Sequence, residues 1–283
     1  MTEKKKVYIV VKTYPTISKE YAELVCTAGI LEDGSWVRLY PVPFRKLDYD
    51  QKYPKYTWVD VEMTRNTKDF RPETYRPTLA TIAVGDKPKK ADWDERRRIV
   101  FNNKKIYTNL QELIDKAKSD GTSLAVFKPT KVLDFIAEAV DREWDAEKLA
   151  ILKSLSQQLN LFQTAEEIEA EYKVVPKVPY KFSYKFEDDS GRQSSLMIED
   201  WETGMLYFNC LKRAEGNEHV AIEKVRQRYY DDFALTKDLH FYLGTTLKFH
   251  NVAPNPFLII GTFHPPIPSA EQQISLFDMN RDG

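Results

Sequence analysis

The chain has 283 residues, of which 42 are basic and 43 acidic, so its formal charge is −1. This balance argues against a protein that coats nucleic acid with general positive charge. Apolar residues make up 42% and aromatic residues 13% of the chain, enough for a sizeable core in one or two domains. No apolar run approaches the about 18 residues of a membrane span, and no apolar signal region precedes the first strand. We therefore expect a cytoplasmic protein that does not contact membranes.

Two cysteines and four histidines limit the disulfide and metal chemistry of the chain. Cys26 and Cys210 cannot form a disulfide framework. The histidines are dispersed, and none has the i, i+4 partner that marks a metal-binding helix. We predict no metal ligand among them and no resident cofactor.

The first 142 residues have the pattern of several short strands. Val7 to Val11 and Glu23 to Ile30 are rich in β-branched residues, and Asp33-Gly34 predicts a hairpin turn into Trp36 to Tyr40. Helices are expected near Glu95 to Ile99 and after the capping pattern that begins at Thr108. The other strand candidates are Thr57 to Met63, Leu79 to Val84, Leu124 to Lys128 and Val132 to Val140. Short strands with few helices between them predict a small barrel.

The pattern changes after Val140. Leucines at helical spacing predict a helix over Asp145 to Leu155, and the prolines of Val175 to Pro179 end the linker that follows it. Tyr180 to Phe186 alternates aromatic and polar residues as a strand does. Two helices, over Leu206 to Lys212 and Val220 to Phe233, and two strands, over Leu239 to Leu243 and Phe257 to Phe263, are expected beyond it. The fold class is thus α+β, with a β-rich, OB-like half at 1–142, a helix and linker at 143–179, a smaller mixed domain at 180–266 and a flexible tail at 267–283.

A pentapeptide that occurs twice is the most specific short signal. It resembles the peptide by which bacterial DNA polymerases and repair proteins dock on the sliding clamp, where a glutamine fixes register and apolar residues fill adjoining pockets. The residues concerned are Gln158, Leu159, Leu161 and Phe162 in one copy and Gln273, Ile274, Leu276 and Phe277 in the other. Alternatively, the first copy ends a helix that packs on the core, and the second docks on its own domain.

Several longer segments resemble an uncharacterised prokaryotic family without an established activity. They are Val11 to Pro15, Cys26 to Ile30, Trp36 to Pro41, Arg71 to Pro77, Tyr180 to Tyr184, Glu199 to Glu202, Leu243 to Thr245 and Pro256 to Pro266. The hairpin tip of that family often carries a cysteine and histidine cluster, which Glu187 to Ser195 lacks, so the resemblance implies no zinc site. The first hairpin also resembles the opening of a dual OB-containing domain, which implies binding of single-stranded nucleic acid or similar ligands.

Cationic and aromatic residues of the first half match such a ligand. Aromatic rings stack on bases while cations follow the phosphates. The candidate nucleic-acid-binding residues are Arg38, Arg45, Arg71, Tyr75, Arg76, Arg96, Arg97 and Arg98. Neighbouring Trp36, Tyr40 and Trp93 add stacking surface. Alternatively, these aromatics lie in the core and the arginine run is a solvated helix face.

Glu199, Asp200 and Glu202 are the best catalytic candidates. Clustered carboxylates can hold Mg²⁺ for phosphodiester hydrolysis, and Lys181 or Lys185 would supply the lysine that a nuclease normally adds. The competing interpretation is that Asp200 caps the following helix and the other acids complement its dipole.

Three functional hypotheses follow from these features. The preferred one is a DNA-associated accessory, repair or phage-defence factor that binds DNA or single-stranded nucleic acid and is tethered to the bacterial DNA sliding clamp. Tethering would compensate for weak intrinsic affinity. The alternatives are a metal-dependent nuclease, which would use Mg²⁺, and a non-catalytic protein-interaction subunit. Whether the protein is an enzyme stays open at this point.

Overall fold

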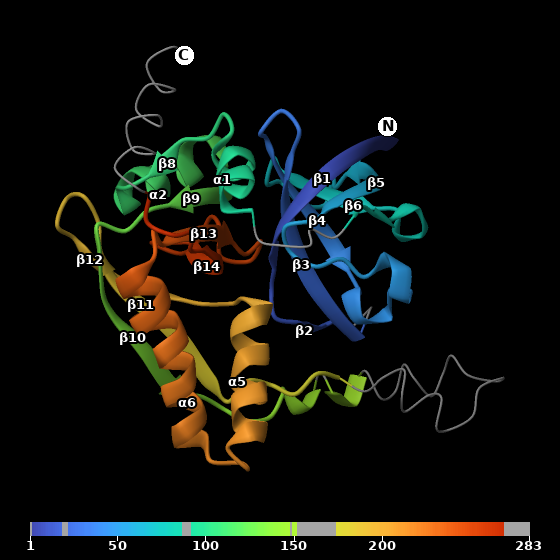
Figure 1. Cartoon of the computed structure of the whole chain (residues 1–283). Helices are drawn as coiled ribbons and strands as arrows, with labels where there is room; N and C mark the ends of the chain where they lie inside the picture. Colours follow the sequence, from blue (N-terminus) through green and yellow to red (C-terminus); the bar gives the residue numbers. More distant parts are fainter. Residues whose placement is uncertain (1, 19–21, 87–91, 148, 152–173, 269–283) are drawn as a thin grey trace.

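The computed structural model describes residues 2–18, 22–86, 92–147, 149–151 and 174–268 (Figure 1). It has the predicted α+β architecture, with a β-barrel in the N-terminal half and a smaller mixed part in the C-terminal half. Across these ranges, no helix has both the length and the apolar character needed to cross a bilayer.

Five strands close into the barrel. They are β1 (Thr2–Lys12), β3 (Ala22–Leu31), β4 (Trp36–Val42), β5 (Trp58–Arg65) and β6 (Thr74–Pro77). The ring runs β1-β3-β4-β6-β5 and closes because β5 pairs with β1. All neighbours are antiparallel except β4 and β6, which are parallel. The small barrel that the short strands predicted is confirmed.

The strands alternate as their sequences require. Val37 and Leu39 of β4 point into the barrel core with Val7, Val59 and Val61, whereas the residues between them face outward. The expected Leu79 to Val84 strand is shorter, because a 3₁₀ turn, η3 (Leu79–Thr81), precedes the two-residue strand β7 (Ala83–Val84). The remaining small elements of this half are β2 (Thr16–Ser18), η1 (Phe44–Lys46) and η2 (Tyr49–Gln51).

Two further sheets and the helices α2, α5 and α6 lie in the described part of the C-terminal half. One sheet has the order β14-β13-β9-β8, and the other has the order β10-β11-β12. The strand bounds are β8 (Ile106–Tyr107), β9 (Leu124–Phe127), β10 (Lys131–Ala139), β11 (Tyr180–Glu187), β12 (Gln193–Met197), β13 (His240–Thr245) and β14 (Phe257–Phe263). The helices are α2 (Leu110–Asp120), α5 (Trp201–Arg213) and α6 (Glu218–Arg226), which continues into a π-helical segment, η4 (Gln227–Ala234). Figure 1 shows α5 and α6 side by side beside β10 and β11.

Local sequence sets the limits of α2. The side chain of Asn109 accepts a hydrogen bond from the backbone N–H of Glu112 at the N-terminus. Gly121, with φ of 78°, ends the helix in the left-handed conformation that glycine adopts without strain. The pattern that begins at Thr108 therefore predicts the correct helix, although the cap is Asn109, one residue later.

Strands β9 and β10, which follow α1 (Trp93–Phe101), pair with strands from later in the chain. β9 pairs with β13, and β10 pairs with β11, although the sequence placed 124–140 with the N-terminal strands. Short-range patterns identify a strand but not its partner, which here lies more than 40 residues away. The division at residue 142 as such stays a prediction.

The outer face of the barrel is covered by the C-terminal sheet. Tyr8, Ala28 and Ile30 on β1 and β3 form one buried cluster with side chains of α1, β9, β13 and β14. Trp36 of β4 meets Tyr242 of β13 edge to face, with ring centroids 6.1 Å apart. The two halves therefore share a core at this face.

Candidate nucleic-acid interface

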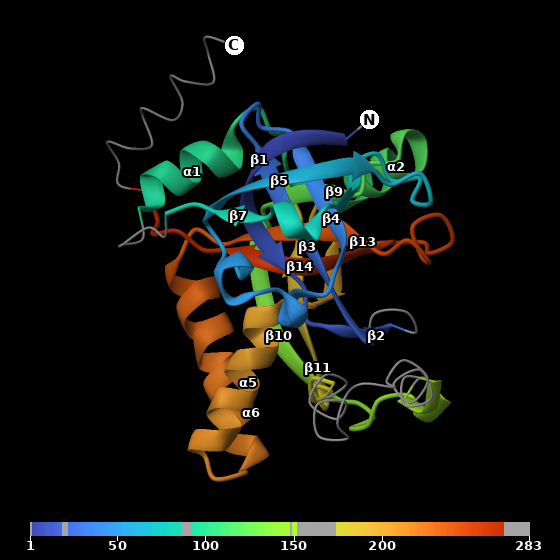
Figure 2. The same cartoon turned by 90° about the vertical axis from the view of Figure 1, so that its right-hand side faces the viewer.

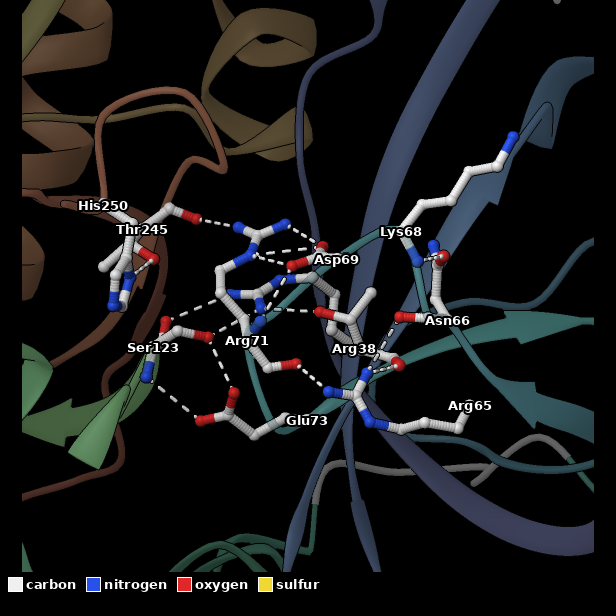
Figure 3. Close-up of polar contacts among 11 residues, drawn as sticks. Arg38, Arg65, Asn66, Lys68, Asp69, Arg71, Glu73, Ser123, Thr245 and His250 are labelled. Atoms are coloured by element: carbon white, nitrogen blue, oxygen red, sulfur yellow. Dashed lines mark hydrogen bonds and ion pairs between the residues drawn. The ribbon is translucent and has the colours of Figure 1, made fainter.

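Arg38 links the barrel to the C-terminal sheet (Figure 3). Its guanidinium is buried, with Nη1 donating to Ser123 Oγ at 2.7 Å and to Thr74 Oγ1 at 3.2 Å, and Nη2 donating to the Ser123 carbonyl at 3.0 Å. Ser123 Oγ in turn donates to a carboxylate oxygen of Glu73 at 2.8 Å. A buried charge is stable only when it is satisfied in this way.

Arg71 forms the second part of this junction. Its Nε and Nη2 donate to the carboxylate of Asp69, and its Nη1 donates to the carbonyl of Thr245 at the end of β13 (Figure 3). Burial alone would raise the pKa of Asp69, but the bonds from Arg71 outweigh it, so this pKa lies below its ordinary value. Thr245 also bonds His250 Nδ1 at 2.7 Å, and His250 Nε2 donates to the carbonyl of Ala117 at 3.1 Å. The β5–β6 loop, the end of β13 and helix α2 are thus held together.

Several of the predicted nucleic-acid-binding arginines serve the interior. Arg38 and Arg71 bind internal partners, and Arg97 donates to Asp238 at 2.8 Å and to the carbonyl of Pro266. Their burial leaves these guanidinium groups out of reach of a phosphate backbone. The sequence does not show which arginines are buried, because each of them has a partner that lies far away in the chain.

The other predicted residues lie nearer the surface. Arg45 donates to Glu23 at 2.6 Å, and Arg96 lies over the rings of Tyr56 and Trp93, 4.2 and 4.8 Å from their centroids. The remaining predicted residues differ in exposure. Tyr75 is half-buried beside Arg65, whereas Arg76 and Arg98 are exposed. Their contact with nucleic acid stays a prediction.

The carboxylates predicted as catalytic lie where α5 meets the barrel. Asp200 is buried, and its side chain caps α5 by accepting from the backbone N–H of Glu202. Lys55 Nζ lies 3.4 Å from Asp200 Oδ2 and 3.0 Å from Glu202 Oε2. The helix cap is therefore present, and the lysine beside the acids comes from the segment that precedes β5. Of the lysines predicted for this role, Lys181 pairs instead with Glu138.

The protonation of this cluster follows from burial and charge. Burial raises the pKa of Asp200 to about 6 although Lys55 opposes it, while Lys55 holds the pKa of the more exposed Glu202 below its usual value. Burial also raises the pKa of Glu199, whose backbone N–H donates to Ile259. The Lys55 ammonium occupies the space between the carboxylates of Asp200 and Glu202, so these residues do not fit Mg²⁺. In the described ranges, no three or more histidine, cysteine, aspartate or glutamate side chains gather as a metal site would require.

An exposed patch that the sequence analysis missed lies above the arginine junction. We call it the loop patch and define it by Lys68, Phe70, Leu247, Lys248, Phe249 and Val252. It holds four of the nine large apolar side chains that are exposed within the described ranges. The ring of Phe70, which is 50% exposed, lies 5.2 Å from that of His250, so the β5–β6 and β13–β14 loops meet here. Figure 2 shows both loops on the same side of the molecule as α2.

The charge of the loop patch is positive. Lys68 and Lys248 are exposed, with Lys248 Nζ 5.1 Å from the ring centroid of Phe249. The two acids of the β5–β6 loop, Asp69 and Glu73, are already bonded to Arg71 and Ser123. Exposed rings with neighbouring ammonium groups provide both stacking surfaces for bases and charges for phosphates. The available signal in the sequence was the presence of Phe70 and Phe249 within loops otherwise rich in polar and turn residues.

Both clamp-like pentapeptides, at 158–162 and 273–277, lie outside the described residues. The structure therefore does not test the roles of Gln158, Leu159, Leu161 and Phe162, or those of Gln273, Ile274, Leu276 and Phe277. Binding to a sliding clamp stays a prediction.

Comparison with known proteins yields two family matches. A family model described as "Domain of unknown function (DUF8758)" matches residues 3–102, and one described as "Domain of unknown function (DUF8757)" matches residues 107–281, more than half of the chain. No curated protein matches. A solved structure of a murine DNA binding protein bound with double-stranded DNA is similar at a TM-score of 0.29 and 11% identity, over 95% of this chain and 97% of that one. A likeness at this TM-score carries no argument about fold or function.

Proposed function

The chain belongs to the family described as a domain of unknown function (DUF8757), and we propose that this protein is a nucleic-acid-binding accessory factor of DNA repair or phage defence, tethered to the bacterial sliding clamp. This membership fits the resemblance to an uncharacterised family. The function rests on the loop patch, which carries exposed aromatic rings and lysines on two loops that meet through Phe70 and His250.

The strand order of the barrel supports this proposal. Numbered along the chain, the five barrel strands follow the cyclic order first, second, third, fifth and fourth, with a parallel pair between the third and the fifth. OB barrels have this order, and they bind oligonucleotides on the face of their second and third strands and with the loops that join strands 1–2 and 4–5. Here the face of β3 and β4 is covered, and the loop between the fourth and fifth strands, 66–73, carries Lys68 and Phe70.

The size of the loop patch favours a short single-stranded ligand. Two rings, Phe70 and Phe249, can stack on one or two bases, at about 1 to 3 kcal/mol for each base. A base is available for such stacking only when it is unpaired. Two stacks and two ammonium groups give modest affinity, which a tether to the clamp would raise through effective concentration.

Fluorescence anisotropy with a labelled single-stranded oligonucleotide tests the patch. We expect Phe70→Ala with Phe249→Ala to weaken binding by at least roughly tenfold, because both stacking surfaces are removed. Tyr49→Ala is the matched control, since Tyr49 is an aromatic residue that is 89% exposed on a different segment of the barrel. Equal affinities of the double variant and this control would contradict the proposal.

Binding to a purified bacterial sliding clamp tests the tether separately. Leu276→Ala with Phe277→Ala removes both apolar anchors of the second pentapeptide, and Leu161→Ala with Phe162→Ala removes those of the first. The expected result is loss of clamp binding in one or both variants, with thermal unfolding as the folding control. If the wild-type protein does not bind at about 100 μM clamp, the tether is rejected. The oligonucleotide experiment then decides separately whether the loop patch binds nucleic acid.

A further inference from the structure

A second lysine, Lys12, lies near Lys55 and its two carboxylate partners and between aromatic rings. Lys12, at the end of β1, donates from Nζ to the carbonyl of Tyr53 at 3.1 Å. The same Nζ lies 4.6 Å from the ring centroid of Phe44 and 5.7 Å from that of Trp201, the first residue of α5. The residue as a whole is half-buried.

Lys12 has another ammonium group as well as two carboxylates near its own amine. Lys55 is the nearby ammonium group, and the carboxylates of Asp200 and Glu202 are the nearby negative charges. Burial, together with the charge of Lys55, outweighs both carboxylates and lowers the pKa of Lys12 to about 8. Near neutral pH, the fraction of this side chain present as free amine is therefore a few hundredfold larger, to within about a factor of ten, than for an ordinary lysine.

Lys55 does not have this property. Its ammonium is buried and contacts both carboxylates, which raise its pKa despite the burial. Its role is to hold α5 against the barrel and to place a positive charge beside Lys12. Apolar surroundings and a second cation are the conditions that activate lysine as a nucleophile.

We propose that Lys12 is a nucleophilic amine that condenses with an aldehyde to form a Schiff base. The lone pair of neutral Nζ attacks the carbonyl carbon, the π electrons move to oxygen, and a proton passes from nitrogen to oxygen. The carbinolamine then loses its hydroxyl group with a second proton from nitrogen as one molecule of water, leaving a carbon–nitrogen double bond. Nothing is oxidised or reduced.

Two sources of aldehyde share this chemistry. One is a small metabolite, and the other is the ring-opened sugar of an abasic site in single-stranded DNA. The second source rests on the proposed function, because it requires the protein to bind nucleic acid. The aldehyde reaction itself does not depend on the loop patch.

Reductive trapping of the full chain tests the proposal. The protein is treated with glycolaldehyde and cyanoborohydride at pH 7.5, and the modified lysines are located by peptide mass spectrometry. We expect Lys12 to be labelled roughly tenfold faster than Lys118, an exposed lysine of α2. The labelling rate of Lys12 should rise with pH and level off above about 8. Equal rates at both lysines, or no plateau for Lys12, would overturn the proposal.

Two variants separate reactivity from a structural role. Lys12→Arg keeps the positive charge but cannot form the imine, so labelling at this position disappears while the folded protein is retained. Glu202→Gln removes a negative charge that favours the ammonium form, so the plateau should move to lower pH. A merely structural lysine would show no such movement, and an unchanged pH profile would count against the proposal.

A single-stranded oligonucleotide with one abasic site identifies the source. A covalent adduct that Lys12→Arg abolishes assigns the nucleic-acid aldehyde, and trapping of glycolaldehyde alone assigns a small one. Failure with both aldehydes rejects the Schiff base and leaves the oligonucleotide-binding proposal intact. Loss of oligonucleotide binding together with retained glycolaldehyde trapping would reject the loop patch instead.

Discussion

Two surfaces of the same barrel differ in their exposure to solvent, and the types of their side chains do not predict this difference. The outer face of β3 and β4 carries Trp36 and Arg38, the mixture that a nucleic-acid surface needs, yet it lies inside the molecule. The loop patch at the end of the barrel has no arginine among its residues, and it is exposed. The strand order of the barrel indicates two surfaces on which a ligand could bind. The C-terminal half, which covers one of them, decides which surface stays exposed to a ligand.

The largest effect is expected when the junction between the barrel and the C-terminal sheet is broken. Arg71→Ala should lower the free energy of unfolding by about 3 to 5 kcal/mol, because it leaves the carboxylate of Asp69 buried without its partner. Urea denaturation measures this cost. Arg76→Ala, an exposed arginine on the adjacent strand, should change stability by less than about 0.5 kcal/mol. Similar costs for both substitutions would show that the junction does not hold the halves together.

The buried face should make stability depend on pH. His240, the first residue of β13, is 2% exposed, and burial lowers the pKa of its ring to about 4 although Asp238 opposes this shift. Because the folded pKa lies below that of the unfolded chain, the contribution is complete above about pH 6.5 and is lost as the pH falls toward 4. We expect the loss to be about 2 to 3 kcal/mol at its largest.

Urea denaturation of His240→Gln at pH 7 and at pH 4.5 measures this difference. The stability gap between wild type and variant should narrow on acidification, because only the wild-type chain carries the buried imidazole. His219→Gln is the control, since His219 is exposed on α6. A gap that stays constant with pH would show that the ring of His240 does not resist protonation in the folded state.

The smallest effect on stability is expected at the exposed end. Lys68→Ala with Lys248→Ala should leave the free energy of unfolding within about 0.5 kcal/mol of wild type. If the patch binds nucleic acid, the same variant should flatten the dependence of log K on log salt by about 1 to 2 units, because two phosphate contacts are lost. Oligonucleotide titrations at several salt concentrations measure this slope. An unchanged slope would instead fit an apolar protein ligand on Phe70, Leu247 and Val252.

Much of the fold could be predicted because local rules dominate there. Asp33-Gly34 marks the first hairpin, the alternation of Tyr180 to Phe186 marks β11, and the capping pattern that begins at Thr108 marks the start of α2 to within one residue. The pairing of β9 with β13 could not be predicted. It joins segments more than 100 residues apart, and no short pattern encodes which strand becomes the neighbour of another.

The candidate site was less predictable for a related reason. Asp200 was expected either to cap α5 or to bind a metal, and its actual partner, Lys55, lies 145 residues earlier in the chain. The burial of Arg38 and the exposure of Phe70 were equally hard to predict, because each is the opposite of what the residue type suggests. The arginine is buried by a distant serine, and the aromatic ring is left exposed on a loop. Burial is decided by the assembled molecule, whereas the type of a side chain is fixed in advance.

The shared core between the barrel and the C-terminal sheet has a consequence for synthesis on the ribosome. All five barrel strands are made by Pro77, but β13, which covers their outer face, begins at His240, about 160 residues later. At about 5 to 20 residues per second, that interval lasts roughly 10 to 30 seconds. During this time Tyr8, Ala28 and Ile30 present an apolar surface to solvent, the kind of surface that a holding chaperone would cover until the last strands emerge.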